Sequence, residues 1–475
     1  MVKSTKKNKN KQFHESSFVN DFHKNKKSLT PILLLSYLLT ILIGCGQVYF
    51  LIRVISGLSL STTMDYWISV LVAFFFFCFS IFFVGKNLIT MFFAFLEGSK
   101  ITAIKLDNHH REPLVTILIP CHNEEKNIVS TLESALSVDY SNLEIIIIDD
   151  GSNDKTLSIA QEYSLNVDAD VKLLHQENSG KAVALNYGYS IAKGSYILSM
   201  DADSELDRNS VRRLVCRSIE SNSGAVAGQV YVNNTNNMLC YLQQLEYVIM
   251  NGTARLFQSY FSSVLIAPGP ITLFDKAALE RTVSFNNELG NSLNHKLSGP
   301  WESSTFAEDA KLSMTMLAAG EKCVFEPSAI CLTQAPSSIS DLMNQRYRWI
   351  RGNLQAIRST WNVWRHAPDK KPSLSIWLMW FIFESLVWPL VDVFGLILIV
   401  ILLANTDAAA EGIIWYMFLI GSDVAAAIFA ASACNGKRRL AFLVPFYRLG
   451  YGLLLQCVAL FSFLDEGRGG KMKWT

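Results

Sequence analysis

Long apolar runs near both ends constrain this 475-residue chain more than any other feature of its sequence. They span residues 31–52, 66–85, 386–404, 413–434 and 440–463. Each is close to the ~20 apolar residues that a helix needs to cross the hydrocarbon core of a bilayer. Hydrophobic residues make up 50% of the chain and charged residues only 17%, which argues against an ordinary soluble enzyme. The sequence therefore predicts a polytopic membrane protein.

The charged residues that flank these apolar runs predict on which side of the membrane each connecting segment lies. The first 28 residues are rich in lysine, which favours a cytosolic tail near the membrane surface and does not point to a nucleic-acid partner. Two crossings return the chain to the cytosol, and Lys437, Arg438 and Arg439 mark a later cytosolic loop. We expect a multi-pass protein of the cytoplasmic (inner) membrane, with the lipid bilayer as a partner. The expected segments are a tail (1–28), two transmembrane helices (29–99), a cytosolic catalytic domain (100–367), an interfacial helix at 373–383 with about three transmembrane helices (368–464), and a tail whose side stays open (465–475).

The middle of the chain alternates strand and helix patterns. Residues 115–120, 143–148 and 195–200 are short runs rich in apolar residues, typical of buried parallel strands. Helical patterns at 125–136 and 181–192 lie between them. This alternation predicts an α/β domain with its ligand site at the carboxyl ends of the strands.

Carboxylates follow the third predicted strand as Asp201-Ala202-Asp203. With Glu308-Asp309 and then Gln345-Arg346-Tyr347-Arg348-Trp349 downstream, this triplet indicates a site of sugar transfer. The diphosphate of a sugar nucleotide builds negative charge as it departs, and carboxylate oxygens suit the Mg²⁺ or Mn²⁺ that would stabilise it. We assign Asp203 to the metal, and Asp201 to the metal edge or the nucleotide. An Asp-x-Asp triplet alone is common, so it gains weight only from the other motifs.

Two further residues are candidates for binding the donor. Asp150, at the end of the second strand, can accept hydrogen bonds from a base or ribose, although an Asx turn with Gly151 and Ser152 is the alternative. Lys181 follows Gly180 at a predicted helix start and can reach a phosphate, although Gly180 can also serve only a turn.

Sugar transfer with inversion needs one base, and Asp309 is our candidate, with Glu308 as its competitor. Both residues can also serve only as a helix N-terminus. Downstream, a helix would place Gln345, Arg348 and Trp349 on one face. Trp349 offers a flat surface for a sugar ring, while Gln345 and Arg348 can contact the diphosphate or the acceptor. A membrane-surface helix is the alternative for this segment.

The ordered set of motifs resembles the processive, membrane-embedded family 2 glycosyltransferases, which include bacterial synthases of poly-N-acetylglucosamine, hyaluronan, cellulose and chitin-like oligosaccharides. The resemblance covers residues 30 to 465. It rests on Pro120-Cys121-His122-Asn123-Glu124, Asp149-Asp150-Gly151-Ser152, Gly180-Lys181 with Asn186, Asp201-Ala202-Asp203, Gly269-Pro270, Glu308-Asp309 and Gln345-Arg346-Tyr347-Arg348-Trp349. It implies a GT-A domain inserted between transmembrane helices, a UDP-sugar donor, and a growing β-linked polysaccharide as acceptor.

The resemblance also implies roles for individual residues. Glu124 and Asp150 would meet the uracil, with Pro120 and Asn123 in the same donor loop. Lys181 would meet the diphosphate and Asp203 the metal, Asp309 would be the base, and Trp349 would form the floor of the acceptor site beside Gly269 and Pro270. Two departures stand out, Ala307 where Thr is usual and Asp275-Lys276 where relatives often have two basic residues, and the second weakens the transfer of acceptor details.

The arrangement of spans is most similar to poly-N-acetylglucosamine synthases, so UDP-N-acetylglucosamine is the leading donor. The expected activity is that of an inverting, processive hexosyltransferase that makes an exopolysaccharide, as in biofilms, and translocates it. The alternatives are a hyaluronan-like or glucan synthase, a transferase that adds one sugar to a lipid or glycan, and an inactive nucleotide-binding export subunit. A small accessory membrane subunit is left open as a partner.

Ionisable residues within the apolar runs need partners, because isolated charges at membrane depth are costly. These residues are Glu384, Asp392, Asp423 and Arg448. We predict that Asp423 pairs with Arg448; lining a polymer path is the other interpretation of this set.

Overall fold

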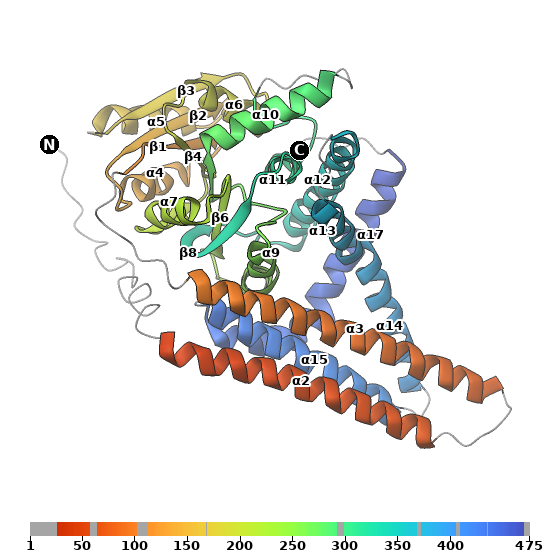
Figure 1. Cartoon of the computed structure of the whole chain (residues 1–475). Helices are drawn as coiled ribbons and strands as arrows, with labels where there is room; N and C mark the ends of the chain where they lie inside the picture. Colours follow the sequence, from red (N-terminus) through yellow and green to blue (C-terminus); the bar gives the residue numbers. More distant parts are fainter. Residues whose placement is uncertain are drawn as a thin grey trace.

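The structure, a computed structural model, describes residues 26–57, 64–101, 112–167, 169–291, 299–367, 372–404, 409–434 and 436–469. A mixed α/β domain occupies the middle of the chain, and long helices from both ends lie together below it (Figure 1). Most of the predicted N-terminal tail, the loop containing Asp407 and the last residues of the predicted C-terminal tail lie outside the described residues.

One sheet of eight strands forms the centre of the α/β domain, in the order β3-β2-β1-β4-β7-β6-β8-β5. The predicted strands are present, and β1 pairs in parallel with both β2 and β4. β7 pairs antiparallel with β4 and β6, so the sheet is mixed where the sequence predicted only parallel strands. The strands are β1 (Val115–Cys121), β2 (Leu143–Asp150), β3 (Val171–Gln176), β4 (Tyr196–Ser199), β5 (Glu205–Leu206), β6 (Ala225–Val232), β7 (Thr272–Asp275) and β8 (Cys323–Thr333).

Helices cover both faces of this sheet because alternate side chains of a strand point to opposite sides. Leu118 of β1 belongs to the core shared with α6, whereas Ile117 and Ile119 belong to the core shared with α4 and α7. The helices of the domain are α4 (Ile128–Leu136), α5 (Thr156–Asn166), α6 (Lys181–Ile191), α7 (Ser210–Ser221), α8 (Met238–Ile249), the π-helical turn η1 (Met250–Arg255), α9 (Leu256–Tyr260), α10 (Lys276–Asn291), α11 (Glu308–Ala318) and α12 (Ile339–His366).

The helices outside the domain are α2 (Lys26–Gly57), α3 (Met64–Ile101), α13 (Pro372–Ile382), η2 (Phe383–Val387), α14 (Trp388–Ala404), α15 (Ala409–Ala433), η3 (Arg438–Leu443), α16 (Val444–Phe446), η4 (Tyr447–Tyr451) and α17 (Gly452–Gly467). Among the described residues, four stretches are long and apolar enough to cross a membrane: Pro31–Tyr49, Pro372–Ile397, Ile413–Ala433 and Arg438–Gly467. The second predicted span, 66–85, lies within the long helix α3 but is not one of these four. The chain is a membrane protein.

The segment 373–383, predicted as a separate interfacial helix, is instead the start of a longer helix. α13, the π-helical turn η2 and α14 follow one another without a break. Pro389 lies in the first turn of α14, and the preceding π-helical turn accommodates its missing N–H. The helix therefore continues across the boundary that the sequence suggested.

Charges within the membrane helices are paired. Arg448 of η4 lies 2.7 Å from Asp423 of α15, which confirms the predicted pair, and 2.8 Å from Asp392 of α14. Glu384 pairs with Lys86 of α3 at 2.8 Å. Each predicted intramembrane charge thus has an opposite charge from another helix.

The α/β domain rests directly on the membrane helices. Gly252 of η1 lies so near α15 that a Cβ on it would be 2.5 Å from the Ala430 backbone. Leu440 and Ala441 of η3 share a small core with Leu245 of α8. The basic loop before η3 therefore lies on the side of the helices that carries the α/β domain, and the cytosolic location of both stays a prediction.

A second connection joins α12 to the end of α17. The Tyr347 hydroxyl donates to Asp465 at 2.8 Å, and Arg351 Nε donates to Glu466 at 2.8 Å. These two contacts, one helical turn apart on α12, form the α12–α17 clasp.

Candidate functional site

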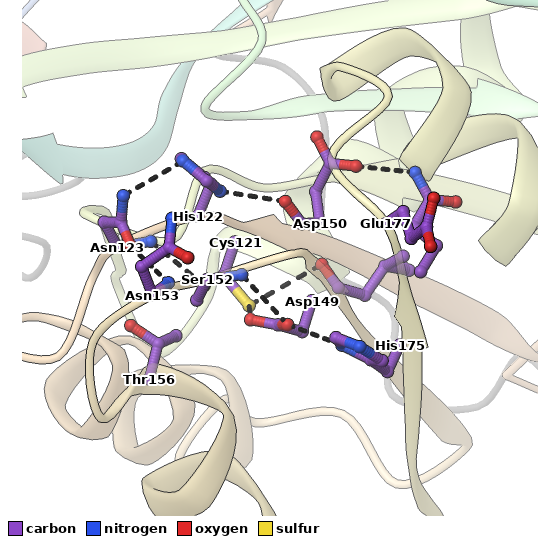
Figure 2. A network of polar contacts seen from close by, with 12 residues as sticks. Cys121, His122, Asn123, Asp149, Asp150, Ser152, Asn153, Thr156, His175 and Glu177 are labelled. Carbon is purple, nitrogen blue, oxygen red and sulfur yellow. Dashed lines mark hydrogen bonds and ion pairs between the residues drawn. The ribbon is translucent and has the colours of Figure 1, made fainter.

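The loops that follow β1 and β2 are joined by hydrogen bonds (Figure 2). Asn123 adopts a positive φ of 57°, which turns the chain back toward the second loop. Its backbone N–H donates to Ser152 Oγ at 3.0 Å, and its side-chain oxygen accepts from the Asn153 N–H at 2.8 Å. His122 Nδ1 donates to the Asp150 carbonyl at 2.8 Å. The predicted donor loop is therefore held at the carboxyl edge of the sheet, as expected for parallel strands.

Asp150 is engaged with the protein itself. One carboxylate oxygen accepts from the Ser179 N–H at 2.9 Å and from the Gln176 side chain at 2.7 Å, and the other accepts from the Gly180 N–H at 2.9 Å. These bonds fix the turn at Gly180, whose φ is 91°, and so set the start of α6 and the position of Lys181. The predicted contact of Asp150 with a base or ribose stays a prediction, and the structure adds this positioning role.

Lys181 is at the centre of the cluster that the sequence predicted. Its ammonium lies 2.6 Å from Asp201 Oδ1 and 3.2 Å from Glu308 Oε1. Burial acts to lower the pKa of Lys181, but the negative charges of Asp201, Glu308 and Asp309 outweigh it and raise that pKa. The loop after β4, the start of α6 and the start of α11 thus meet at the ammonium group of Lys181.

Gly269 closes this cluster from the side of the β7 loop. Its backbone N–H donates to Asp309 Oδ2 at 3.1 Å. A Cβ on it would stand 2.8 Å from Lys181 Nζ, so a larger residue would push the ammonium aside. The sequence singled out Gly269-Pro270 only by resemblance, and the structure gives the physical reason for a glycine.

Asp309 lies half-buried in the first turn of α11, where the Ala310 N–H donates to its other oxygen at 2.7 Å. Burial, together with the negative charge of Glu308, raises the pKa of Asp309 to about 6, although Lys181 acts in the opposite direction. A carboxyl with that pKa is ionised at neutral pH and accepts a proton more readily than an ordinary aspartate.

The carboxylates near Asp203 repel one another. Burial, then Asp201 and Glu124, raise the pKa of Asp203 to about 6. Burial also raises the pKa of Glu124, against a hydrogen bond of 2.8 Å that its carboxylate accepts from Asn127. A divalent cation would relieve this repulsion, so the donor set fits Mg²⁺ or Mn²⁺.

In the part of the chain that the structure describes, no three His, Cys, Asp or Glu side chains are grouped closely enough to ligate a metal by themselves. Asp201 is already paired with Lys181, and Asp203 Oδ1 accepts hydroxyl hydrogen bonds from Ser204 at 3.1 Å and Thr333 at 3.3 Å. A cation here would therefore complete its shell with ligand and water oxygens, as Mg²⁺ commonly does.

Helix α12 carries the predicted Gln345, Arg348 and Trp349, and it reaches the site through Gly352. A Cβ on Gly352 would be 2.7 Å from the backbone of Ala307, the residue before Glu308. Trp349, one turn earlier, is 38% exposed, and Arg348 is exposed. Among the described residues, no hydrogen bond or ion pair joins these three side chains to the cluster around Lys181. Their donor and acceptor contacts stay predictions.

Sequence reasoning missed Arg255 of η1. The residue is buried, and its guanidinium donates to Asn251 at 2.5 Å. Burial lowers the pKa of Arg255 to about 10, while the negative charge of Asp309 acts to raise it. Nothing in the local sequence separates this arginine from a surface one, because its neighbours come from other elements.

Comparison with known proteins agrees with this geometry. The structure resembles that of the mannosyltransferase PcManGT from Pyrobaculum calidifontis, solved with GDP-Man and Mn²⁺, with a TM-score of 0.55 at 18% identity, over 84% of this chain and 100% of that one. Residues 116–283 match the family Glycosyl transferase family 2. Residues 116–283 therefore form a family 2 glycosyltransferase domain, and the fold around it is the GT-A fold.

Relatives by sequence carry a more specific name. A poly-beta-1,6-N-acetyl-D-glucosamine synthase of Staphylococcus epidermidis is 28% identical over 383 residues, which are 77% of this chain and 88% of that protein. A protein of the same name from Staphylococcus aureus is 30% identical over 244 residues, which are 51% of this chain and 55% of that protein.

Proposed function

We propose that this chain is an inverting, processive synthase that transfers N-acetylglucosamine from UDP-N-acetylglucosamine to a growing β-linked exopolysaccharide. The observation that carries the proposal is the meeting of Asp201, Lys181, Glu308 and Asp309 within one half-buried cluster. N-acetylglucosamine is chosen as the sugar because the relatives from Staphylococcus are named poly-beta-1,6-N-acetyl-D-glucosamine synthases. The other donors that the sequence left open, those of hyaluronan-like and glucan synthases, are the competing outcomes of a donor screen.

The chemistry follows from the charges. The acceptor oxygen forms a bond to the anomeric carbon while its proton passes to the Asp309 carboxylate, and the bond from that carbon to UDP breaks with its electrons leaving on UDP. Lys181 and the N–H groups at the start of α6 hold the diphosphate. Asp203 and Asp201 would hold a Mg²⁺ or Mn²⁺ ion, which supplies positive charge against the leaving group.

Binding of the donor must rearrange the cluster. The Lys181 ammonium is paired with Asp201 and Glu308, so a diphosphate has to compete with these two carboxylates for it. The exchange frees a carboxylate oxygen of Asp201, which could then help to hold a divalent cation. Lys181 and Asp201 therefore act together in our proposal.

Candidate membrane-spanning helices on both sides of the catalytic domain support translocation of the product by the same chain. The contact of η3 with α8 supports a cytosolic catalytic domain, since the loop before η3 is strongly basic. A transferase that adds a single sugar would share the donor site but would not need these helices for export.

The proposal is tested with purified protein in detergent, supplied with UDP-N-acetylglucosamine and Mg²⁺ or Mn²⁺. We expect UDP release and a polymer, and we expect Asp309→Asn to lower turnover by about 10²–10⁴-fold, as loss of a general base does. Thermal unfolding of the variant is the control for folding. Full turnover by Asp309→Asn would refute the base, and a product extended by one sugar would refute processivity.

A further inference from the structure

Arg346 stands between the predicted site residues Gln345 and Arg348 but faces another way. Its side chain is buried, and its Nη2 donates to Glu246 Oε2 of α8 at 2.8 Å. The Tyr451 hydroxyl of η4 donates to the same carboxylate oxygen at 2.5 Å. The guanidinium is therefore held by one residue of the catalytic domain and one of the membrane helices.

The same guanidinium lies over the indole of Trp349. Its central carbon is 4.4 Å from the centroid of that ring, well within the range of a cation–π contact. Arg346 and Trp349 are three positions apart on α12, so they are neighbours on the helix surface. The indole thus has one face against a fixed cation, while 38% of the residue remains exposed.

The position of Trp349 makes this contact relevant to transfer. Gly352, three residues further along α12, packs against Ala307 and so against the start of the helix that carries Asp309. A ring fixed at this turn keeps a constant relation to the base. A ring free to change rotamer would not.

We propose that Arg346, held by Glu246 and Tyr451, is a positioning residue that fixes the Trp349 indole as the platform for the acceptor sugar. This inference rests on the proposed function. The exposed part of the indole stacks on the sugar, and the guanidinium keeps the ring from turning away between successive additions.

The test measures the KM for a primer separately from the KM for the donor. With wild-type protein in detergent, UDP release is followed at increasing concentrations of a β-1,6-linked N-acetylglucosamine pentasaccharide. We expect Arg346→Gln to raise the primer KM by about tenfold, as when the indole holds its binding rotamer only about a tenth of the time, and the donor KM by less than about twofold. Arg346→Lys should restore only part of the primer affinity, because an ammonium does not stack on an indole as a planar guanidinium does.

Arg351 provides a matched control. It is a buried arginine on the same helix, paired at 2.8 Å with Glu466 of α17. Its guanidinium lies over the ring of Tyr347, whereas that of Arg346 lies over Trp349. In detergent, Arg351→Gln keeps the Tyr347–Asp465 contact of the α12–α17 clasp and should leave the primer KM within about twofold of wild type. An equal rise in both variants would show that general packing of α12 is responsible and would overturn the proposal.

Two further variants keep the test decisive. Glu246→Gln combined with Arg346→Gln removes both charges together, so no buried carboxylate is left alone if the single variant unfolds. In a Trp349→Ala background, Arg346→Gln should add nothing to the primer KM, since the group that it positions is gone. Additive effects with an active wild type would overturn this inference alone, whereas a wild type that releases no UDP would overturn the proposed function as well.

Discussion

The surroundings of Asp309 raise the pKa of its carboxyl group and so make it a stronger base than an ordinary aspartate. Burial and the neighbouring Glu308 both oppose its ionisation, and together they raise its pKa to about 6. A base must be ionised to accept a proton, so we expect kcat/KM to fall as the pH drops through about 6, and not near the ordinary aspartate value of about 4. Rates of UDP release between pH 4.5 and 8, with the divalent ion saturating, measure this acidic limb of the pH–rate profile.

Glu308→Gln separates the two candidate bases. It removes the like charge beside Asp309, so the acidic limb should move to lower pH while turnover persists. A limb that stays in place, or a loss of turnover like that of Asp309→Asn, would contradict the assignment.

Residue types and order were enough to predict that Asp201, Lys181, Glu308 and Asp309 belong to one site. Each follows a strand or begins a helix, and such ends converge in an α/β domain. The hydrogen bonds of Asp150 to the Gly180 turn could not be predicted, because they depend on the fold of the loop after β3. Arg346 was missed because its partner Glu246 lies 100 positions earlier in the chain.

At the scale of elements, the contact of η1 with α15 joins the catalytic domain to the membrane. A Cβ at Gly252 would meet the Ala430 backbone at 2.5 Å, and backbone cannot move aside as a flexible side chain does. We expect Gly252→Ala to lower the free energy of unfolding by about 1–3 kcal/mol, the usual cost of overpacking. Thermal or denaturant unfolding in detergent measures the loss.

Gly395→Ala in α14 is the matched control, because a Cβ there would have no heavy atom within 4 Å. This variant should unfold like wild type. If Gly252→Ala were equally stable, η1 and α15 would not be held as closely as the structure has them.

Strands and helices with a strong hydrophobic pattern in the sequence could be predicted, and the others could not. β1 and β2 are runs of apolar, mostly β-branched residues buried on both faces, so their parallel pairing followed from the sequence. β7 has only four residues, and its antiparallel pairing with β4 and β6 depends on contacts distant in sequence. The π-helical turns have no sequence signature of this kind.

Across the whole molecule, one arginine joins three membrane helices. Arg448 of η4 is paired with Asp423 of α15 and Asp392 of α14 at the same time. Arg448→Ala would leave two carboxylates facing each other at membrane depth, so we expect a loss of about 3–5 kcal/mol in the free energy of unfolding. Asp423→Asn should cost less, because Asp392 still pairs with the arginine; unfolding in detergent compares the two.

Because Asp392 is a second partner of Arg448, exchanging the charges of Asp423 and Arg448 should not preserve the pairing. Asp423→Arg with Arg448→Asp would place a carboxylate at position 448 beside Asp392, so the exchange should not restore stability. Recovery to the wild-type level would show that Asp392 has no part in the pairing. The sequence predicted one partner correctly, and only the packing of three helices revealed the other.

The α12–α17 clasp ties the helix that bears Trp349 to the last helix of the chain through Asp465 and Glu466. α17 belongs to a candidate span, and such spans tilt when the thickness of the surrounding bilayer does not match their apolar length. The clasp would carry any such tilt into α12, so we expect bilayer thickness to affect how α12 packs against the α/β domain.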